Sequence, residues 1–362
     1  MSDDDDEQYR LFQELFNSTY DTSDPTYVVS ENVQLCIKTS VNQFGAKFIP
    51  VFYYVNFLLS YLGNGLVLCI IYKYERLNTV TNIFLLNLVL SNFLFAASLP
   101  FWATYHLSDW IFGTALCKLV SSAYFIGFYS SILFLTLMTF DRYLAVVHAV
   151  AAAKSRKRLY AIVASVSVWF VSIAASVKEL VLRNVWKDNL SGWMCEESGY
   201  AESTMERFRL VSYYQQFLLF FLLPLFMVMY CYISITVRIL STRMKEKCRS
   251  IKLIFVIIAT FFVCWTPYNV VILLRAIQIS VTREEDKPCS DSLDYALYVT
   301  RNIAYLYCCI SPVFYTFVGK KFQSHFKRLI SKKIPCLKGH MSFSSQSTRS
   351  TSQRTPHSAY EY

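Results

Sequence analysis

The fold is decided by stretches such as FIPVFYYVNFLLSYLGNGLVLCIIY at residues 48–72, which contains no Lys, Arg, Asp or Glu. About 20 apolar residues are enough for a helix to cross the hydrocarbon core of a bilayer. Further apolar runs follow at roughly 82–105, 116–140, 160–182, 211–238, 252–277 and 293–318. The sequence therefore predicts an all-α membrane protein, with a seven-transmembrane helix bundle over residues 48–318.

The composition supports a membrane protein. Of the 362 residues, 54% are hydrophobic and only 17% are charged, whereas soluble domains carry about 25% charged residues. No cleavable signal peptide is expected, because the first residues are acidic and no short apolar core follows them. Cysteines inside the apolar runs lack His and carboxylate neighbours, so we expect no metal and no cofactor.

The positions of Lys and Arg predict the orientation. They gather after the first, third, fifth and seventh runs, near residues 73–76, 154–158, 238–252 and 320–328. Basic loops stay in the cytoplasm, so the N-terminus should be extracellular and the C-terminus cytoplasmic. The net charge of +10 then reflects topology, and nucleic acid is not an expected partner.

Three further segments flank the predicted bundle. Residues 1–47 form an acidic extracellular segment that begins with DDDDE at 3–7. Residues 319–330 alternate Phe with Lys and Arg, which is typical of a short cytoplasmic amphipathic helix lying on membrane lipids. Residues 331–362 are rich in Ser and Thr, and we expect a disordered cytoplasmic tail.

Several residues of the flanking segments and loops are candidates for modification. Cys336 is either a palmitoylation site or a plain thiol. The Ser and Thr cluster at 344–352 either recruits arrestin after phosphorylation or has no such role. N-x-S/T sequons at Asn17 and Asn189 lie on the predicted outside and are candidate glycosylation sites. Tyr9, Tyr20 and Tyr27 lie near acidic residues, and are either sulfated or plain exposed tyrosines.

Four cysteines fall at predicted extracellular positions: Cys36, Cys117, Cys195 and Cys289. Disulfides are expected in the oxidising extracellular environment. Four cysteines allow three pairings, and the residues themselves do not choose among them.

Two sites carry charge inside or at the end of an apolar run. Arg301 lies about two to three turns into the last run. Its long stem could reach the interface, but at that depth we expect a cavity-facing role, because ionisable residues inside a membrane usually serve function. Asp141-Arg142 ends the third run, where opposite charges can neutralise each other.

The apolar runs carry motifs that together resemble the rhodopsin-type seven-helix G-protein-coupled receptors. They are Gly63-Asn64, Asp141-Arg142-Tyr143, Trp169, Pro224 with Tyr232, Cys264-Trp265-Thr266-Pro267, and Pro312 with Tyr315. The resemblance implies a Cys117–Cys195 disulfide. It also implies signalling roles for Asp141, Arg142, Tyr143, Tyr232, Trp265, Pro267, Pro312 and Tyr315. The prolines bend their helices, which suits a helix that swings on activation.

Within that family the chain resembles the chemokine receptors. DRYLAVVHAV at 141–150 and SLPFW at 98–102 are similar to their motifs, and the likeness implies a second disulfide, Cys36–Cys289. The stretches 252–269 and 294–309 look most like the XC branch, which binds C-class (lymphotactin-type) chemokines. Arg301 agrees with that branch, because most CC and CXC receptors have glutamate there.

The resemblance implies an extracellular chemokine ligand, and a heterotrimeric G protein of the inhibitory class and arrestin as intracellular partners. The implied ligand-binding residues are Tyr53, Trp102, Tyr124, Glu179, Gln216, Tyr268 and Arg301. Each aromatic residue could equally be part of the bundle core. Glu179 is a candidate counter-ion for Arg301, although Lys178 could also pair with it, and Asp294 lies about two turns above Arg301.

Two departures from the family pattern affect the region between ligand site and cytoplasmic face. Asn92 replaces the usual sodium-binding aspartate, whereas Ser131 still matches, so sodium should bind poorly. Ser311 replaces the usual asparagine before Pro312.

Alternative functions are a CC-type chemokine receptor and a chemokine-scavenging receptor. The intact Asp141-Arg142-Tyr143 argues against the scavenger. No nucleophile–base arrangement suggests an enzyme.

Overall fold

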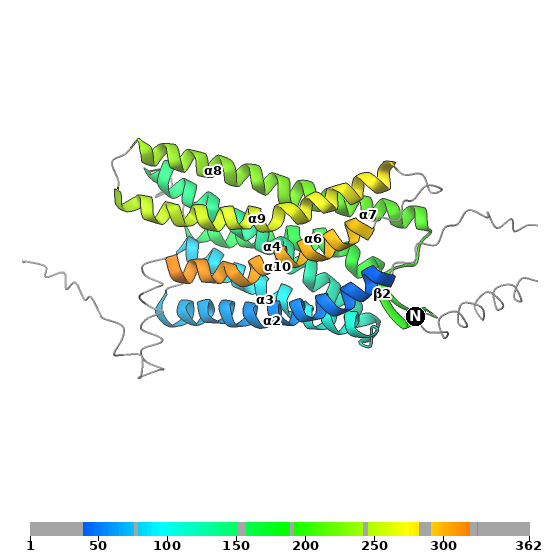
Figure 1. The fold of residues 1–362 in the computed structure, drawn as a ribbon. Helices are drawn as coiled ribbons and strands as arrows, with labels where there is room; N and C mark the ends of the chain where they lie inside the picture. The colour runs from blue at the N-terminus through cyan, green and yellow to red at the C-terminus, as the bar shows by residue number, and fades with distance from the viewer. Residues whose placement is uncertain are drawn as a thin grey trace, which may run out of the picture.

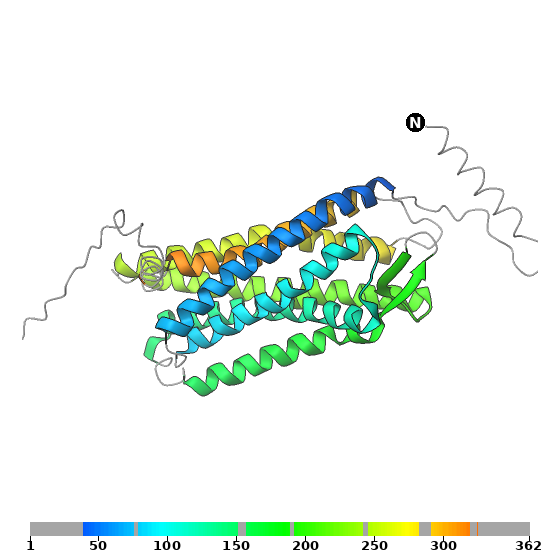
Figure 2. The ribbon, with the colours of Figure 1, turned by 90° about the horizontal axis from the view of Figure 1, so that it is seen from below.

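The structure, a computed structural model, describes residues 39–75, 79–150, 157–188, 192–241, 245–281 and 291–318, together with Ser324. Seven long helical segments lie side by side (Figures 1 and 2). In chain order they are α2 (Thr39–Tyr74), α3 (Val80–Leu107), α4 (Gly113–Val147), α6 (Arg158–Leu182), the continuous α7–η1–α8, α9 (Lys245–Val281) and α10 (Asp291–Val318). The predicted seven-helix bundle is therefore confirmed.

Six of these segments are long and apolar enough to cross a membrane within the described residues. Their lipid-facing sides are apolar and exposed, as α6 shows with Val166 63% and Phe170 71% exposed. Such a surface is unfavourable in water and suits the hydrocarbon core of a bilayer.

The fifth segment is one helix interrupted by a π-turn. It consists of α7 (Glu202–Phe217), η1 (Leu218–Leu222) and α8 (Leu223–Leu240). Pro224 is the second residue after η1. A proline cannot donate the backbone hydrogen bond that an α-helix needs, and its ring crowds the preceding turn. The wider π-turn accommodates Pro224 without ending the helix.

A β-hairpin connects α6 to α7. Strands β1 (Arg183–Asp188) and β2 (Gly192–Glu197) pair antiparallel, with Val185 opposite Cys195. Figure 1 shows the hairpin at one end of the bundle, which we call the hairpin end. α2, α4, α7 and α10 begin there, while α3, α6 and α9 finish there, so the loops predicted to be basic connect the helices at the opposite end.

The core near the hairpin end is aromatic. Trp265 packs on Phe128 with ring centroids 4.8 Å apart, and Tyr129 stacks on Phe220 at 3.8 Å. A second, mostly aliphatic cluster nearer the opposite end includes Val67, Leu88 and Phe134.

Some predictions fall outside the described residues. They concern most of the acidic segment, the amphipathic helix and tail, Cys36 and Cys289, and the modification sites Asn17, Asn189, Tyr9, Tyr20, Tyr27 and Cys336. Pro312 and Tyr315 lie within α10, in a part whose backbone alone is described.

Candidate ligand site and signalling residues

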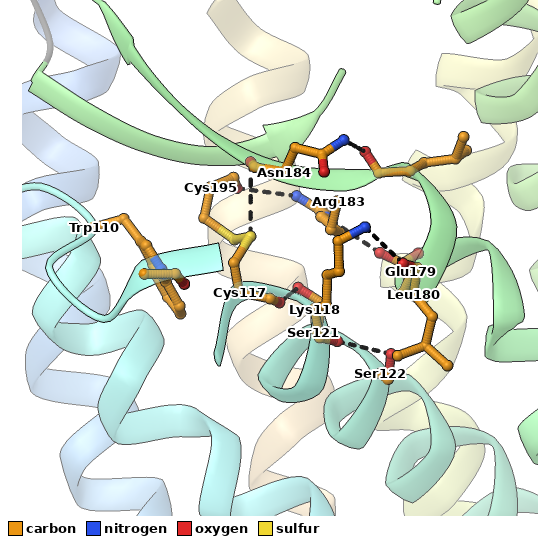
Figure 3. Close-up of a disulfide and its surroundings, with 12 residues drawn as sticks. Trp110, Cys117, Lys118, Ser121, Ser122, Glu179, Leu180, Arg183, Asn184 and Cys195 are labelled. Carbon is orange, nitrogen blue, oxygen red and sulfur yellow. Dashed lines mark hydrogen bonds and ion pairs between the residues drawn. A yellow bond between two sulfur atoms is a disulfide. The ribbon is translucent and has the colours of Figure 1, made fainter. Parts of the chain in front are cut away.

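The hairpin is fastened to the start of α4. Cys117 and Cys195 form a disulfide with their Cα atoms 5.7 Å apart, which confirms the pairing that the family resemblance implied. Beside it, Lys118 Nζ donates to the carbonyl oxygens of Leu180 at 2.8 Å and Val181 at 3.3 Å (Figure 3). An ammonium group at the last carbonyls of a helix is favourable, so α4 holds both the hairpin and the end of α6.

The tip of the hairpin is also held. The backbone N–H of Trp110 donates to the Trp193 carbonyl at 2.7 Å. The Trp193 N–H donates to Asp109 Oδ2 at 3.2 Å. Strand β2 is thus fixed at two points, Trp193 and Cys195, to the chain around the start of α4.

Five charged side chains form a network beneath the hairpin. Glu179 is buried and contacts Arg183 Nε at 2.9 Å and Lys178 Nζ at 3.0 Å. Glu197 continues the network, with Lys178 at 3.1 Å and Arg209 at 3.7 Å. The network joins α6, both strands and α7.

This arrangement decides between the two partners considered for Glu179. Its carboxylate pairs with Lys178 and Arg183, and among the described side chains it forms no ion pair with Arg301. The reason is local: Arg183 lies four residues after Glu179, so the two meet at the end of the same helix.

The pKa of Glu197 is lowered. Burial opposes the charged carboxylate, but attraction to Lys178, Arg183 and Arg209, with a hydrogen bond from Lys178, outweighs the burial. The carboxylate is therefore held in its charged form by the network.

Arg301 lies among aromatic side chains. Its guanidinium carbon lies 5.7 Å from the ring centroid of Tyr298, and Tyr53, Tyr124 and Tyr268 are within electrostatic range. Within the parts of the chain that the structure describes, no carboxylate forms an ion pair with Arg301, and its buried Nε has no hydrogen-bond partner. A guanidinium can rest on aromatic faces, but they leave its N–H donors unsatisfied.

The predicted ligand residues divide into separate groups. Tyr53, Tyr124 and Tyr268 gather around Arg301, and Gln216 on α7 neighbours Tyr268. Trp102 instead packs on Trp110 at 5.5 Å and under Arg183 at 5.9 Å. Trp102 and Glu179 therefore belong to the support of the hairpin.

Three neighbours of Arg301 and its tyrosines were not among the ligand residues predicted from the sequence. Tyr298 and Tyr305 lie one helical turn on either side of Arg301, and that spacing could have revealed them. Tyr305 contacts the rings of Tyr53 and Tyr124 at 5.9 and 5.7 Å. His106 on α3 lies 6.0 Å from Tyr53, and no local pattern in the sequence pointed to it.

Trp265 connects this aromatic group with the bend of α9. It is 1% exposed and contacts Phe128 and Tyr268, and Pro267 lies two residues further along the helix. Asn269 Nδ2 donates to the Trp265 carbonyl at 2.9 Å, one turn along the same helix.

At the opposite end, Asp141 is buried and accepts a hydrogen bond from Thr81 Oγ1 at 3.1 Å, while Arg142 is exposed. Tyr143 hydroxyl lies 3.0 Å from His148 Nε2 and 3.5 Å from Tyr230 hydroxyl. Tyr232 is half-buried on α8. These contacts join α3, α4 and α8.

The residues expected at the altered sodium site form hydrogen bonds with neighbouring side chains and carbonyl groups. Asn92 Nδ2 donates to Asn64 Oδ1 at 3.0 Å, and Asn64 Nδ2 donates to the Ser60 carbonyl at 2.9 Å. Ser131 Oγ donates to the Phe128 carbonyl at 2.9 Å. Asn92 supplies no carboxylate to this site.

Seven packed helices, a disulfide-tied hairpin and a buried tryptophan at a proline bend define a seven-helix membrane receptor. The profile of the family described as "7 transmembrane receptor (rhodopsin family)" matches residues 63–315. The chain is 36% identical to C-C chemokine receptor type 3 of Cavia porcellus over 310 residues, covering 85% of this chain and 86% of that protein. It is 36% identical to C-C chemokine receptor type 1 of Homo sapiens over 322 residues, covering 88% and 89%. For C-C chemokine receptor type 4 of Homo sapiens the identity is 34% over 294 residues, covering 81% of each chain.

The chain belongs to the chemokine receptors of the rhodopsin family. Members of this family are multi-pass proteins of the plasma membrane and are signalling receptors, not enzymes.

Proposed function

We propose that this chain is a cell-surface receptor for C-class chemokines. It signals through heterotrimeric G proteins of the inhibitory class, and so gives calcium release and cell migration. The observation that carries the ligand class is Arg301, which lies among four tyrosines and has no carboxylate partner within the described residues. By the resemblance noted above, most CC and CXC receptors have glutamate at this position. The ligand group that contacts Arg301 should therefore differ in charge from the group that contacts this glutamate in those receptors.

The ligand reaches Arg301 from the hairpin end, which faces the outside. There Arg301 binds a carboxylate or a backbone carbonyl of the chemokine N-terminus, and Tyr53, Tyr124, Tyr268 and Gln216 line the site. The acidic segment 1–47, with its candidate sulfated tyrosines, attracts the basic body of the chemokine, because opposite potentials raise association rates. Cys36–Cys289 would hold this segment to the loop before α10.

The opposite end faces the cytoplasm. Trp265 transmits the ligand contact to the lower half of α9 through the bend at Pro267. Arg142 and the neighbouring basic loops then bind the G protein. The amphipathic helix at 319–330 lies on membrane lipids, and the phosphorylated tail recruits arrestin.

The test is a binding and signalling comparison on cells that express the receptor. A C-class chemokine should bind, release calcium and lower cyclic AMP, and R301Q and R301E should weaken all three responses by tenfold or more, because a hydrogen bond to a charged group contributes about 1.5–3 kcal/mol. R207Q is the matched control, since Arg207 is an exposed cation of α7 at the same end. Unchanged affinity in R301Q would refute the role of Arg301.

A CC-type receptor is the second candidate, because the curated relatives reported above are C-C chemokine receptors. Binding of a CC-class but not a C-class chemokine would establish it. Binding with arrestin recruitment but no fall in cyclic AMP would indicate a scavenging receptor.

A further inference from the structure

The hairpin-end halves of α9 and α10 face each other through two rungs of side chains. The outer rung, nearer the helix ends, is an ion pair between Arg275 of α9 and Asp294 of α10. The inner rung consists of Tyr268 of α9 and Arg301 of α10, which interact electrostatically. Each outer residue is seven positions from the inner residue of its own helix, so the two share one helix face. Arg275 therefore lies on the same face of α9 as Tyr268, which faces Arg301.

Both arginines of these rungs are incompletely satisfied. The Nε atoms of Arg275 and Arg301 are buried, and neither has a hydrogen-bond partner within the described part of the chain. Arg275 contacts Asp294 through an Nη atom, which leaves Nε without an acceptor. A buried donor without a partner is unfavourable, so an acceptor brought in by a ligand would gain affinity at both positions.

Two other carboxylates at this end are already engaged. Glu179 and Glu197 are held by Lys178, Arg183 and Arg209 in the network beneath the hairpin. Arg275 and Asp294 are instead 24% and 11% exposed, so the outer rung can be reached from the end of the bundle. A peptide that runs between α9 and α10 toward Arg301 would pass Arg275 first.

We propose that Arg275 is a second ligand-binding cation, which Asp294 holds in position. The entering ligand segment then presents hydrogen-bond acceptors to Arg275 and Arg301 in turn. This deepens the proposed function and rests on it. Seven helical residues span about 10 Å. An extended peptide covers that distance in about three residues. The ligand class is therefore an extended peptide terminus with acceptor groups about three residues apart, at least one of them anionic.

Asp294 has a positioning role in this scheme. It neutralises Arg275 in the free receptor and keeps its guanidinium turned toward α10. When a ligand acceptor takes the free Nε, the ion pair can remain, because a guanidinium has five N–H donors. The ligand then adds a contact without breaking the link between α9 and α10.

The experiment measures the affinity of whichever chemokine from a C-class and CC-class panel binds the wild-type receptor. That chemokine is used both intact and with its flexible N-terminal segment removed. The variants are R275Q, R275K and the charge swap R275D/D294R, with R207Q, at an exposed position of α7, as the control. R275K keeps a cation for Asp294 but lacks the Nε donor, so it still gives a result if R275Q fails to reach the cell surface.

R275Q and R275K should each weaken binding of the intact chemokine by about ten- to a hundredfold, the loss expected for a hydrogen bond to a charged group. Both should leave binding of the truncated chemokine unchanged, and the swap should not restore affinity for the intact ligand. An equal loss for both ligands, or wild-type affinity in the swap, would show that the pair only links α9 to α10. If the panel member that binds is of the CC class, the C-class proposal fails, while the same variants still decide the role of Arg275.

Discussion

Gly127 is a point of close backbone contact between α3 and α4, and we predict that adding one methyl group there destabilises the receptor. A Cβ at this position would lie 2.5 Å from the backbone N of Phe95 and 2.8 Å from both Phe95 Cα and the Ser91 carbonyl oxygen. All three atoms belong to the backbone of α3, so no side-chain rotation relieves the contact. Small residues commonly allow this close approach between membrane helices.

The size of the effect follows from the geometry. Ordinary contact begins at 3.4 Å, so α3 and α4 must separate by about 0.9 Å. One turn away, the 2.8 Å hydrogen bond from Ser130 to Ser91 joins the same two helices and would be stretched. Overpacking typically costs about 1–3 kcal/mol, and a weakened hydrogen bond about 0.5–1.5 kcal/mol. Replacing Gly by Ala within a helix returns about 1 kcal/mol, so we expect G127A to lower the free energy of unfolding by about 1–3 kcal/mol.

The assay is thermal unfolding of the purified, ligand-free receptor, followed by tryptophan fluorescence. G127A should lower Tm by roughly 2–6 °C, taking about 2 °C per kcal/mol for a protein of this size. The matched control is G65A, because a Cβ at Gly65 meets nothing within 4 Å, and this variant should be unchanged or slightly more stable. The reasoning is refuted if G127A melts at or above the temperature of G65A.

Three further predictions concern the charge network and the former sodium site. E179Q should lower the free energy of unfolding by about 2 kcal/mol in the same thermal unfolding assay. This is less than the roughly 3–5 kcal/mol expected for breaking a fully buried ion pair, because Lys178 and Arg183 are both 21% exposed. E196Q, at an exposed position, is the control, and equal Tm values for the two variants would contradict the prediction. Folding lowers the pKa of Glu197, so this carboxylate stabilises the fold above the pKa that it has in the unfolded chain, and the stabilisation is lost as pH falls through the lower pKa of the folded state. E197Q should therefore be less stable than the wild type at neutral pH and equally stable only in acid. Equal stability near neutral pH would contradict the prediction. Replacing sodium by N-methylglucamine should leave ligand affinity of the wild-type receptor unchanged, whereas N92D should gain a sodium dependence of about fivefold or more; a sodium-dependent wild type would show that the Asn92–Asn64 contact does not replace the ion.

The bundle was predictable because a bilayer imposes a length on its helices. The apolar run at 48–72 identified the first helix but missed its start at Thr39, and the run at 252–277 missed the start of α9 at Lys245. In both cases the helix continues beyond the hydrocarbon core, where polar residues meet no penalty. Hydrophobicity therefore located the membrane-crossing part of each helix but underestimated the length of the helix.

The contacts of the site were less predictable, because they depend on which helices meet. Arg301 was recognised from its charge, yet its ring of tyrosines comes from α2, α4, α9 and α10. The pairing of Glu179 with Arg183 was visible in the sequence as a four-residue spacing, and it excludes Glu179 as the partner of Arg301. Trp102 was predicted from a recognisable motif, but its position under Arg183 was not. That contact depends on the hairpin, which the Cys117–Cys195 disulfide holds against the bundle.

The division of charge at the hairpin end explains how one site can be both stable and receptive. The carboxylates beneath the hairpin are neutralised by cations from α6, β1 and α7, so this support keeps its shape without a ligand. Arg301 lies outside that network, and its positive charge is offset only by aromatic faces and hydroxyl groups among the described residues. Leaving its buried donor unpaired lowers the stability of the free receptor. A ligand acceptor that pairs with this donor gains binding free energy for the same reason. Tyr268 lies between Arg301 and Trp265, so ligand binding at Arg301 acts directly on α9, the helix that carries Trp265 and Pro267.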